Sequence, residues 1–122
     1  MAKTVLLIED EPNIIEAVSF ILSRDGWDVQ THSNGHDAID AVRRRAPDLI
    51  ILDVMLPGKS GYDILSEIRD DPVSGRVPVL MLTARGQTRD REMAERAGAD
   101  RYMTKPFSNA DVLEAVRALA GT

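Results

Sequence analysis

Three short apolar runs, each followed by polar residues, constrain the fold of this chain more than any other feature. They are residues 5–8, before Glu9 and Asp10; residues 49–52, before Asp53; and residues 79–82, before Thr83. Unbroken apolar runs of this length are typical of strands buried on both faces of a parallel sheet. Because parallel strands end at the same edge, where ligands bind, the sequence predicts three carboxylates and a hydroxyl at one place.

Strand-like and helix-like patterns alternate five times along the chain. The expected strands are residues 3–8, 27–32, 49–52, 79–82 and 100–104. The expected helices begin near Pro12, at Asn34, after Ser60, at Thr88 and after Ser108. Alternation of this kind requires parallel pairing through right-handed crossovers. The sequence therefore predicts a five-stranded parallel, doubly wound α/β sheet flanked by five helices, with residues 1–122 forming a single domain.

Composition restricts the possible functions. A chain of 122 residues with 43% hydrophobic and 29% charged residues is typical of one soluble globular domain. The absence of cysteine excludes disulfides and thiolate metal sites, and it fits a cytoplasmic location. No apolar stretch approaches the ~20 residues of a membrane span. The net charge of −5 argues against direct binding of nucleic acid by this domain.

The predicted edge has the groups that phosphoryl transfer requires. Three carboxylates in one place need a cation to offset their repulsion, and oxygen ligands with several waters suit Mg²⁺. Lys105 follows the fifth expected strand, so its ammonium can reach the same edge. Asp53 would be the nucleophile, while the metal and Lys105 balance the charge on the transferred group and Thr83 hydrogen-bonds one of its oxygens. Each residue alone has a structural explanation, but their joint placement favours chemistry.

Four motifs, in order, carry a resemblance to a known family. They are residues 5–12 (VLLIEDEP), 53–62 (DVMLPGKSGY), 83–85 (TAR) and 98–107 (GADRYMTKPF). With this spacing the chain resembles the receiver domain of bacterial two-component response regulators (CheY-like) from Lys3 to Leu119. The resemblance implies a flavodoxin-like sheet with strand order 2-1-3-4-5.

The resemblance also implies a role for each motif residue. Asp53 is expected to be the phosphoacceptor, and Thr83 and Lys105 to contact the phosphoryl group. The implied Mg²⁺ ligands are Asp10, Asp53 and the main-chain carbonyl of Met55, with Glu9 acting mainly through water. Tyr102 is expected to change rotamer together with Thr83. The phosphoryl group would come from a sensor histidine kinase or a phosphotransfer protein. The domain would catalyse only its own phosphotransfer and dephosphorylation, so it is not expected to be a conventional enzyme.

The output of such a domain is expected at the surface formed by the fourth helix, fifth strand and last helix, where a downstream protein partner would dock. An alternative is a receiver domain cut from a longer DNA-binding transcriptional regulator. The resemblance implies that winged-helix members of the family dimerise through pairs of opposite charges on this surface, and Arg91 and Asp111 could keep one such pair. Arg101 and Arg96 instead stand where acids are usual, and Ala115 stands where a base is usual. This pattern favours a single-domain receiver or a receiver of another subfamily. The expected state is a monomer or a phosphorylation-dependent dimer that binds neither nucleic acid nor membrane.

Two rival functions fit the sequence less well. A flavodoxin-like binder of a phosphorylated cofactor needs an uncharged loop after the first strand. Residues 9–12 (EDEP) would repel a phosphate instead. A magnesium-dependent phosphatase with an aspartyl intermediate usually has a second acid two residues after its nucleophile, and that position is Met55 here.

Overall fold

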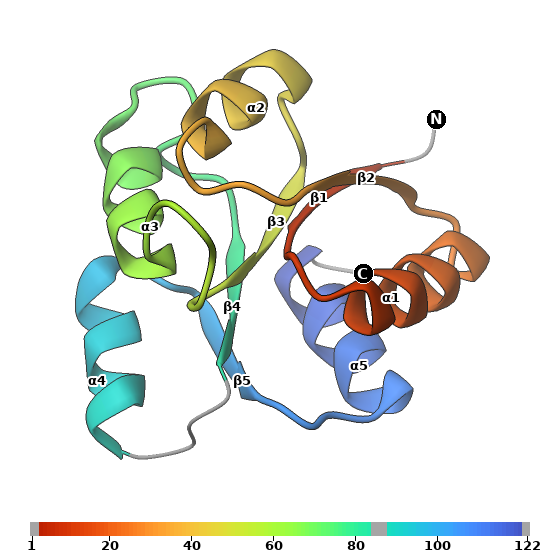
Figure 1. Cartoon of the computed structure of the whole chain (residues 1–122). Coiled ribbons are helices and arrows are strands. Elements are labelled where there is room, and N and C mark those ends of the chain that lie inside the picture. The colour runs from red at the N-terminus through yellow and green to blue at the C-terminus, as the bar shows by residue number, and fades with distance from the viewer. Residues whose placement is uncertain (1–2, 84–87, 121–122) are drawn as a thin grey trace.

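The computed structural model of the chain describes residues 3–83 and 88–120, and its strands form one parallel sheet in the order β2-β1-β3-β4-β5 (Figure 1). The strands are β1 (Thr4–Ile8), β2 (Asp28–His32), β3 (Leu49–Asp53), β4 (Val79–Thr83) and β5 (Arg101–Thr104). The helices are α1 (Pro12–Arg24), α2 (Ala38–Arg45), α3 (Gly61–Asp70), α4 (Thr88–Ala97) and α5 (Asn109–Ala120). The predicted doubly wound fold and its strand order are confirmed.

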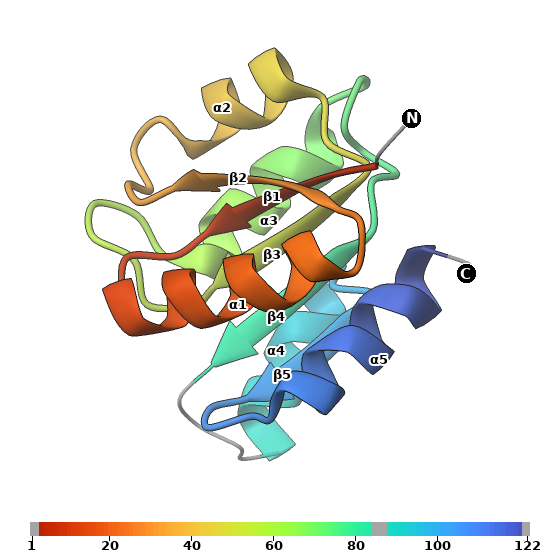
Figure 2. The same cartoon turned by 90° about the vertical axis from the view of Figure 1, so that its right-hand side faces the viewer.

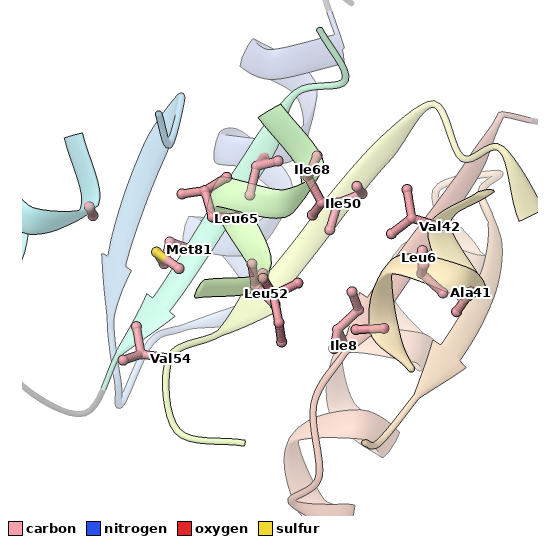
Figure 3. Packing of buried hydrophobic residues seen from close by; sticks show 14 residues of the cluster. Leu6, Ile8, Ala41, Val42, Ile50, Leu52, Val54, Leu65, Ile68 and Met81 are labelled. Carbon is pink, nitrogen blue, oxygen red and sulfur yellow. The ribbon is translucent and has the colours of Figure 1, made fainter. Parts of the chain in front are cut away.

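The apolar runs are continuous because helices cover both faces of the sheet. Successive side chains of a strand point to opposite faces. In β1, Leu6 and Ile8 belong to a buried cluster with residues of α2, α3 and α4, whereas Val5 and Leu7 belong to a second cluster with residues of α1 and α5. Figures 1 and 2 show α1 and α5 together on one face and the other helices on the opposite face. Figure 3 shows the first cluster, where Ile50 of β3 lies close to Ile68 of α3.

Two of the predicted helix starts are confirmed by their caps. The Ser60 hydroxyl accepts a hydrogen bond from the Asp63 N–H at the start of α3. Ser108 and Asp111 form a reciprocal capping box at the start of α5, with distances of 3.1 and 3.3 Å. Both caps join residues only three positions apart, so local sequence is sufficient to specify them.

The predicted start of the second helix at Asn34 is wrong. The Asn34 side chain instead accepts a hydrogen bond from the His36 N–H at 2.8 Å, which forms a turn, and α2 begins only at Ala38. The Gly35 N–H donates to the Pro57 carbonyl at 3.0 Å. The loop before α2 is therefore held against the loop after β3, a long-range contact that overrides local capping preference.

Helix α4 is weakly anchored. Among residues 91–97, whose side chains the structure describes, only Ala94 is buried, and Met93 is 45% exposed. A helix with so little buried apolar surface costs less to move than its neighbours. In the described part of the chain, no helix has the length and apolar character needed to cross a bilayer.

Candidate functional site

The carboxyl edge of the sheet brings together residues from four strands. Glu9 and Asp10 directly follow β1, Asp53 and Thr83 are the last residues of β3 and β4, and Lys105 directly follows β5. Backbone hydrogen bonds continue the sheet past these ends. The Val54 N–H donates to Leu82 at 2.9 Å, and the Lys105 N–H donates to Thr83 at 2.7 Å. The backbone at this edge is therefore fixed by the sheet.

Three carboxylates form the centre of the site. One oxygen each from Glu9, Asp10 and Asp53 lies within 4.8 Å of the others. Glu9 is 0% exposed and Asp53 1% exposed, whereas Asp10 faces solvent. Glu9 Oε2 accepts hydrogen bonds from the N–H groups of Asp10 (3.0 Å) and Glu11 (3.2 Å), which fixes its orientation.

Among the residues that the structure describes, Lys105 brings positive charge to these carboxylates. Its Nζ lies 3.0 Å from Glu9 Oε1 and 3.3 Å from Asp53 Oδ1. Burial opposes the charged form, but Glu9 and Asp53 together hold the pKa of Lys105 above its usual value. Burial raises the pKa of Glu9; the Lys105 ammonium acts against this shift, and nearby Asp53 reinforces it. One ammonium thus balances only part of the negative charge.

The site fits a hard divalent cation. Although Lys105 is within ion-pair distance, neither Glu9 Oε1 nor Asp53 Oδ1 has a partner in hydrogen-bonding geometry. Buried oxygens without such partners are costly unless another cation completes their coordination. Met55 lies two residues after Asp53 and is 72% exposed. Because magnesium prefers oxygen to sulfur, only the Met55 carbonyl is a suitable ligand from that residue.

Thr83 and Tyr102 lie on the same face of neighbouring strands. Met81 in β4 and Tyr102 in β5 are paired in register, and both pack with the cluster on the side of α2, α3 and α4. Thr83, two residues after Met81, points to that same face by the alternation of a strand. The two residues expected to switch together therefore lie beside α4. Ala84 and Arg85, which complete the third motif, lie outside the described residues.

The structure adds Glu11 to the site. Its Oε1 lies 3.3 Å from Lys105 Nζ. The sequence interpretation gave Glu11 no role of its own, although it is the third acid in the run that follows β1. That uninterrupted run was the signal available in the sequence, but its third member could not be assigned without knowing where Lys105 points.

Comparisons with known proteins agree with this geometry. The model of the response regulator receiver domain family matches residues 5–117. The probable transcriptional regulatory protein TcrX of Mycobacterium tuberculosis is 46% identical over 116 residues, which are 95% of this chain and 49% of that protein. The chain thus spans about half the length of this curated relative.

Solved structures of similar proteins also cover the whole chain. A response regulator from Chloroflexus aurantiacus has a TM-score of 0.94 and 30% identity, with 100% of both chains covered. The receiver domain of the sensor histidine kinase PA1611 from Pseudomonas aeruginosa has a TM-score of 0.91 and 31% identity, also with 100% of both chains covered. That receiver domain holds a magnesium ion in its active-site cleft.

Proposed function

Because the chain belongs to the response regulator receiver domain family, we propose that it acts in two-component phosphorelay signalling by accepting a phosphoryl group on Asp53. A receiver domain is a signalling domain rather than a conventional enzyme. One observation carries the proposal: a buried carboxylate, Asp53, lies 3.3 Å from the Lys105 ammonium and close to two further carboxylates at a sheet edge. This arrangement combines a nucleophile with cationic groups that stabilise developing charge.

Magnesium would be held by Asp10, Asp53 and the Met55 carbonyl, with Glu9 acting mainly through water. Support comes from the three clustered carboxylates, the buried oxygens without hydrogen bonds, and the magnesium held by the similar PA1611 receiver domain. When bound, the ion supplies positive charge beside Asp53 and the oxygens of the incoming phosphoryl group.

In the transfer step, an oxygen of the Asp53 carboxylate forms a bond to phosphorus as the phosphorus–nitrogen bond of a donor phosphohistidine breaks. The electron pair of that bond remains on the imidazole nitrogen. Lys105 faces the phosphoryl oxygens, and the Thr83 hydroxyl donates a hydrogen bond to one of them. Attack of water on the acyl phosphate later returns Asp53 and inorganic phosphate, which resets the domain.

The signal would leave through the surface formed by α4, β5 and α5. Phosphorylation adds roughly two negative charges at Asp53. Thr83 would move toward the phosphoryl group, and Tyr102 on the neighbouring strand would then change rotamer. Weak anchoring of α4 supports this route, since α4 covers the face to which both residues point.

The proposed partners are a sensor histidine kinase or phosphotransfer protein as donor and a downstream protein as receiver of the signal. We propose no contact of this domain with nucleic acid or membrane. Three predictions remain: a cytoplasmic location, a single receiver domain over residues 1–122, and a monomeric or phosphorylation-dependent dimeric state.

A second candidate is a receiver domain that regulates a DNA-binding domain in the same polypeptide. It is favoured by the 46% identity to TcrX, a transcriptional regulatory protein of about twice this length. The open reading frame beyond the codon for Thr122 distinguishes the two candidates. A reading frame that continues into a DNA-binding domain supports the second, and a stop codon supports the single-domain receiver.

Labelling with a small phosphodonor tests the function. Incubation with Mg²⁺ and acetyl phosphate should add one phosphoryl group, labile to base as an acyl phosphate is, and Asp53→Asn should abolish the labelling. Asp28→Asn is the control because Asp28 begins β2, at the opposite edge of the sheet. Undiminished labelling of Asp53→Asn would place the nucleophile elsewhere.

A further inference from the structure

We infer that Glu11 is a positioning residue that restrains Lys105 and thereby limits the rate of phosphoryl transfer to Asp53. The inference rests on the proposed function for the reaction that it affects, but the contact itself can be tested without that reaction. It concerns a residue outside the group of carboxylates that fits the metal.

The Lys105 ammonium has three carboxylate neighbours. Glu9 Oε1 lies at 3.0 Å, Asp53 Oδ1 at 3.3 Å and Glu11 Oε1 at 3.3 Å from Nζ. Glu9 and Asp53 are fully buried, whereas the Glu11 side chain is 58% exposed. The ammonium, with a side chain only 12% exposed, is therefore held between the interior of the site and its mouth.

A bound cation would weaken the interactions of Lys105 with Glu9 and Asp53 relative to its interaction with Glu11. Glu9 and Asp53 belong to the group of carboxylates that fits a metal ion, so a cation would compete with Lys105 for them. Glu11 does not belong to that group, and its carboxylate would still interact with the ammonium. With a cation bound, Glu11 would therefore contribute a larger share of the negative charge that holds Lys105, from the side of the mouth.

The backbone holds Glu11 in place for this contact. Its carbonyl accepts the N–H groups of Ile14 (3.1 Å) and Ile15 (3.0 Å) at the start of α1, and its own N–H donates to Glu9 Oε2. Glu11 occupies the N-cap of α1, yet its side chain makes no capping hydrogen bond. Its carboxylate is thus available to Lys105 rather than to the helix.

Glu11 and Lys105 also share a groove beside the site. This groove has a volume of about 430 Å³, and its other walls include Ile14, Ala17 and Phe107. An incoming phosphoryl group must draw the ammonium away from Glu11 before Lys105 can contact its oxygens. Removing the Glu11 charge should make that movement easier.

The reaction is tested with acetyl phosphate and Mg²⁺. An Asp53 oxygen bonds to phosphorus as the bond to the acetate oxygen breaks, and acetate leaves with the electron pair. In Glu11→Gln the labelling rate at saturating acetyl phosphate should rise about two- to fivefold, the range expected for loss of a partly exposed ion pair. Glu16→Gln removes the same charge from an exposed position of α1 and should leave this rate within experimental error.

The contact is tested without any phosphodonor. In the magnesium-saturated protein, the ¹⁵N and ¹H signals of the Lys105 ammonium should shift and exchange faster with water in Glu11→Gln, and should match wild type in Glu16→Gln. A Lys105 signal that Glu11→Gln leaves unchanged, or equal rate changes in both variants, would overturn the inference. A wild-type chain that takes no label from acetyl phosphate would instead overturn the proposed function, with the ammonium signals still reporting on the contact.

Discussion

Burying Glu9 and Asp53 costs free energy. Both carboxylates lose their hydration almost completely, and the ion pairs that they form with the same Lys105 ammonium do not fully compensate for that loss. Packing gains nothing from this arrangement, because apolar side chains of similar volume would fill the same space without repulsion. This burial cost has a function if the negative charge of Glu9 and Asp53 serves to bind a cation, which in turn helps to bind a phosphoryl group.

Magnesium should therefore stabilise the folded chain through Asp10. At a free Mg²⁺ concentration about 100-fold above its dissociation constant, the free energy of unfolding should rise by about 2.7 kcal/mol. In Asp10→Asn this increase should largely disappear, since the exposed member of the carboxylate cluster, our proposed ligand, has lost its charge. Urea unfolding with and without Mg²⁺ measures it, with Asp28→Asn as the control. Equal stabilisation of Asp10→Asn and wild type would exclude Asp10 as a ligand.

Asp71, remote from the site in sequence, ties α2 to the end of α3. Its Oδ2 lies 2.8 Å from Arg43 Nε, and its Oδ1 accepts the Val73 N–H at 3.1 Å. The Arg43 guanidinium, followed by the Val73 N–H, holds the pKa of Asp71 below its ordinary value of 3.8. The carboxylate is thus stabilised in its ionised form.

This shift predicts an acid-dependent loss of stability. Because the pKa is lower in the folded than in the unfolded chain, the contribution is complete above the unfolded value and is lost as pH falls through the folded one. Asp71→Asn should lower the free energy of unfolding at pH 7, and its difference from wild type should shrink below about pH 4. Urea unfolding across this pH range measures both effects. Asp70→Asn, at an exposed neighbouring position, is the control.

The junction between β3 and α3 positions Asp53. The Gly61 N–H donates to the Val54 carbonyl at 2.9 Å, and Gly61 begins α3. A Cβ atom at residue 61 would lie 2.3 Å from the Asp53 carbonyl oxygen and 2.8 Å from Val54 Cα. Both neighbours are backbone atoms of the sheet edge, so no side-chain rotation can relieve the clash.

Gly61→Ala should therefore disturb both stability and the site. The helix start or the strand end must shift, at a cost of about 1–3 kcal/mol in unfolding free energy. Because the same shift moves Asp53 and the Met55 carbonyl, magnesium affinity should fall as well. Denaturant unfolding and magnesium titration measure the two effects, with Ser66→Ala on the exposed side of α3 as control. Wild-type values for both would show that this junction tolerates movement.

In the molecule as a whole, the strand order places the carboxylate site close to the surface formed by α4, β5 and α5. Asp53 and Thr83 end neighbouring central strands, and β5 lies next to β4 with Tyr102 beside Met81. The side chain of Arg101, which precedes Tyr102, points to the opposite face and pairs with Glu114 of α5 at 3.3 Å. Strand β5 therefore contacts α4 through one face and α5 through the other.

Binding of a phosphoryl mimic should reveal that change. With Mg²⁺ and beryllofluoride, changes in amide exchange or chemical shift should be concentrated in residues 83–107, because α4 has little buried surface to hold it. Asp53→Asn provides the control, since the mimic should not bind to it. Changes confined to the surroundings of Asp10 and Asp53, with α4 unaffected, would mean that this domain does not signal through the α4, β5 and α5 surface.

Much of this architecture can be read from local pattern. A buried parallel strand needs an unbroken apolar run, and the runs before Glu9, Asp53 and Thr83 have that form. Once strands and helices alternate, their carboxyl ends must share one edge, so the acids come together without knowledge of any distance. The caps at Ser60 and Ser108 were predictable for the same reason, since each depends on residues a few positions apart.

Other features arise from contacts between segments that are distant in the sequence, so they cannot be predicted from the local sequence pattern. The pairing of Lys105 with Glu11 joins residues 94 positions apart, and the turn at Asn34 depends on a loop that follows another strand. The tight approach of Gly61 to Asp53 likewise depends on how α3 is set against β3. These contacts are decided by the packing of whole elements, because the free energy of a long-range contact exceeds the weak preference of any single residue for its local conformation.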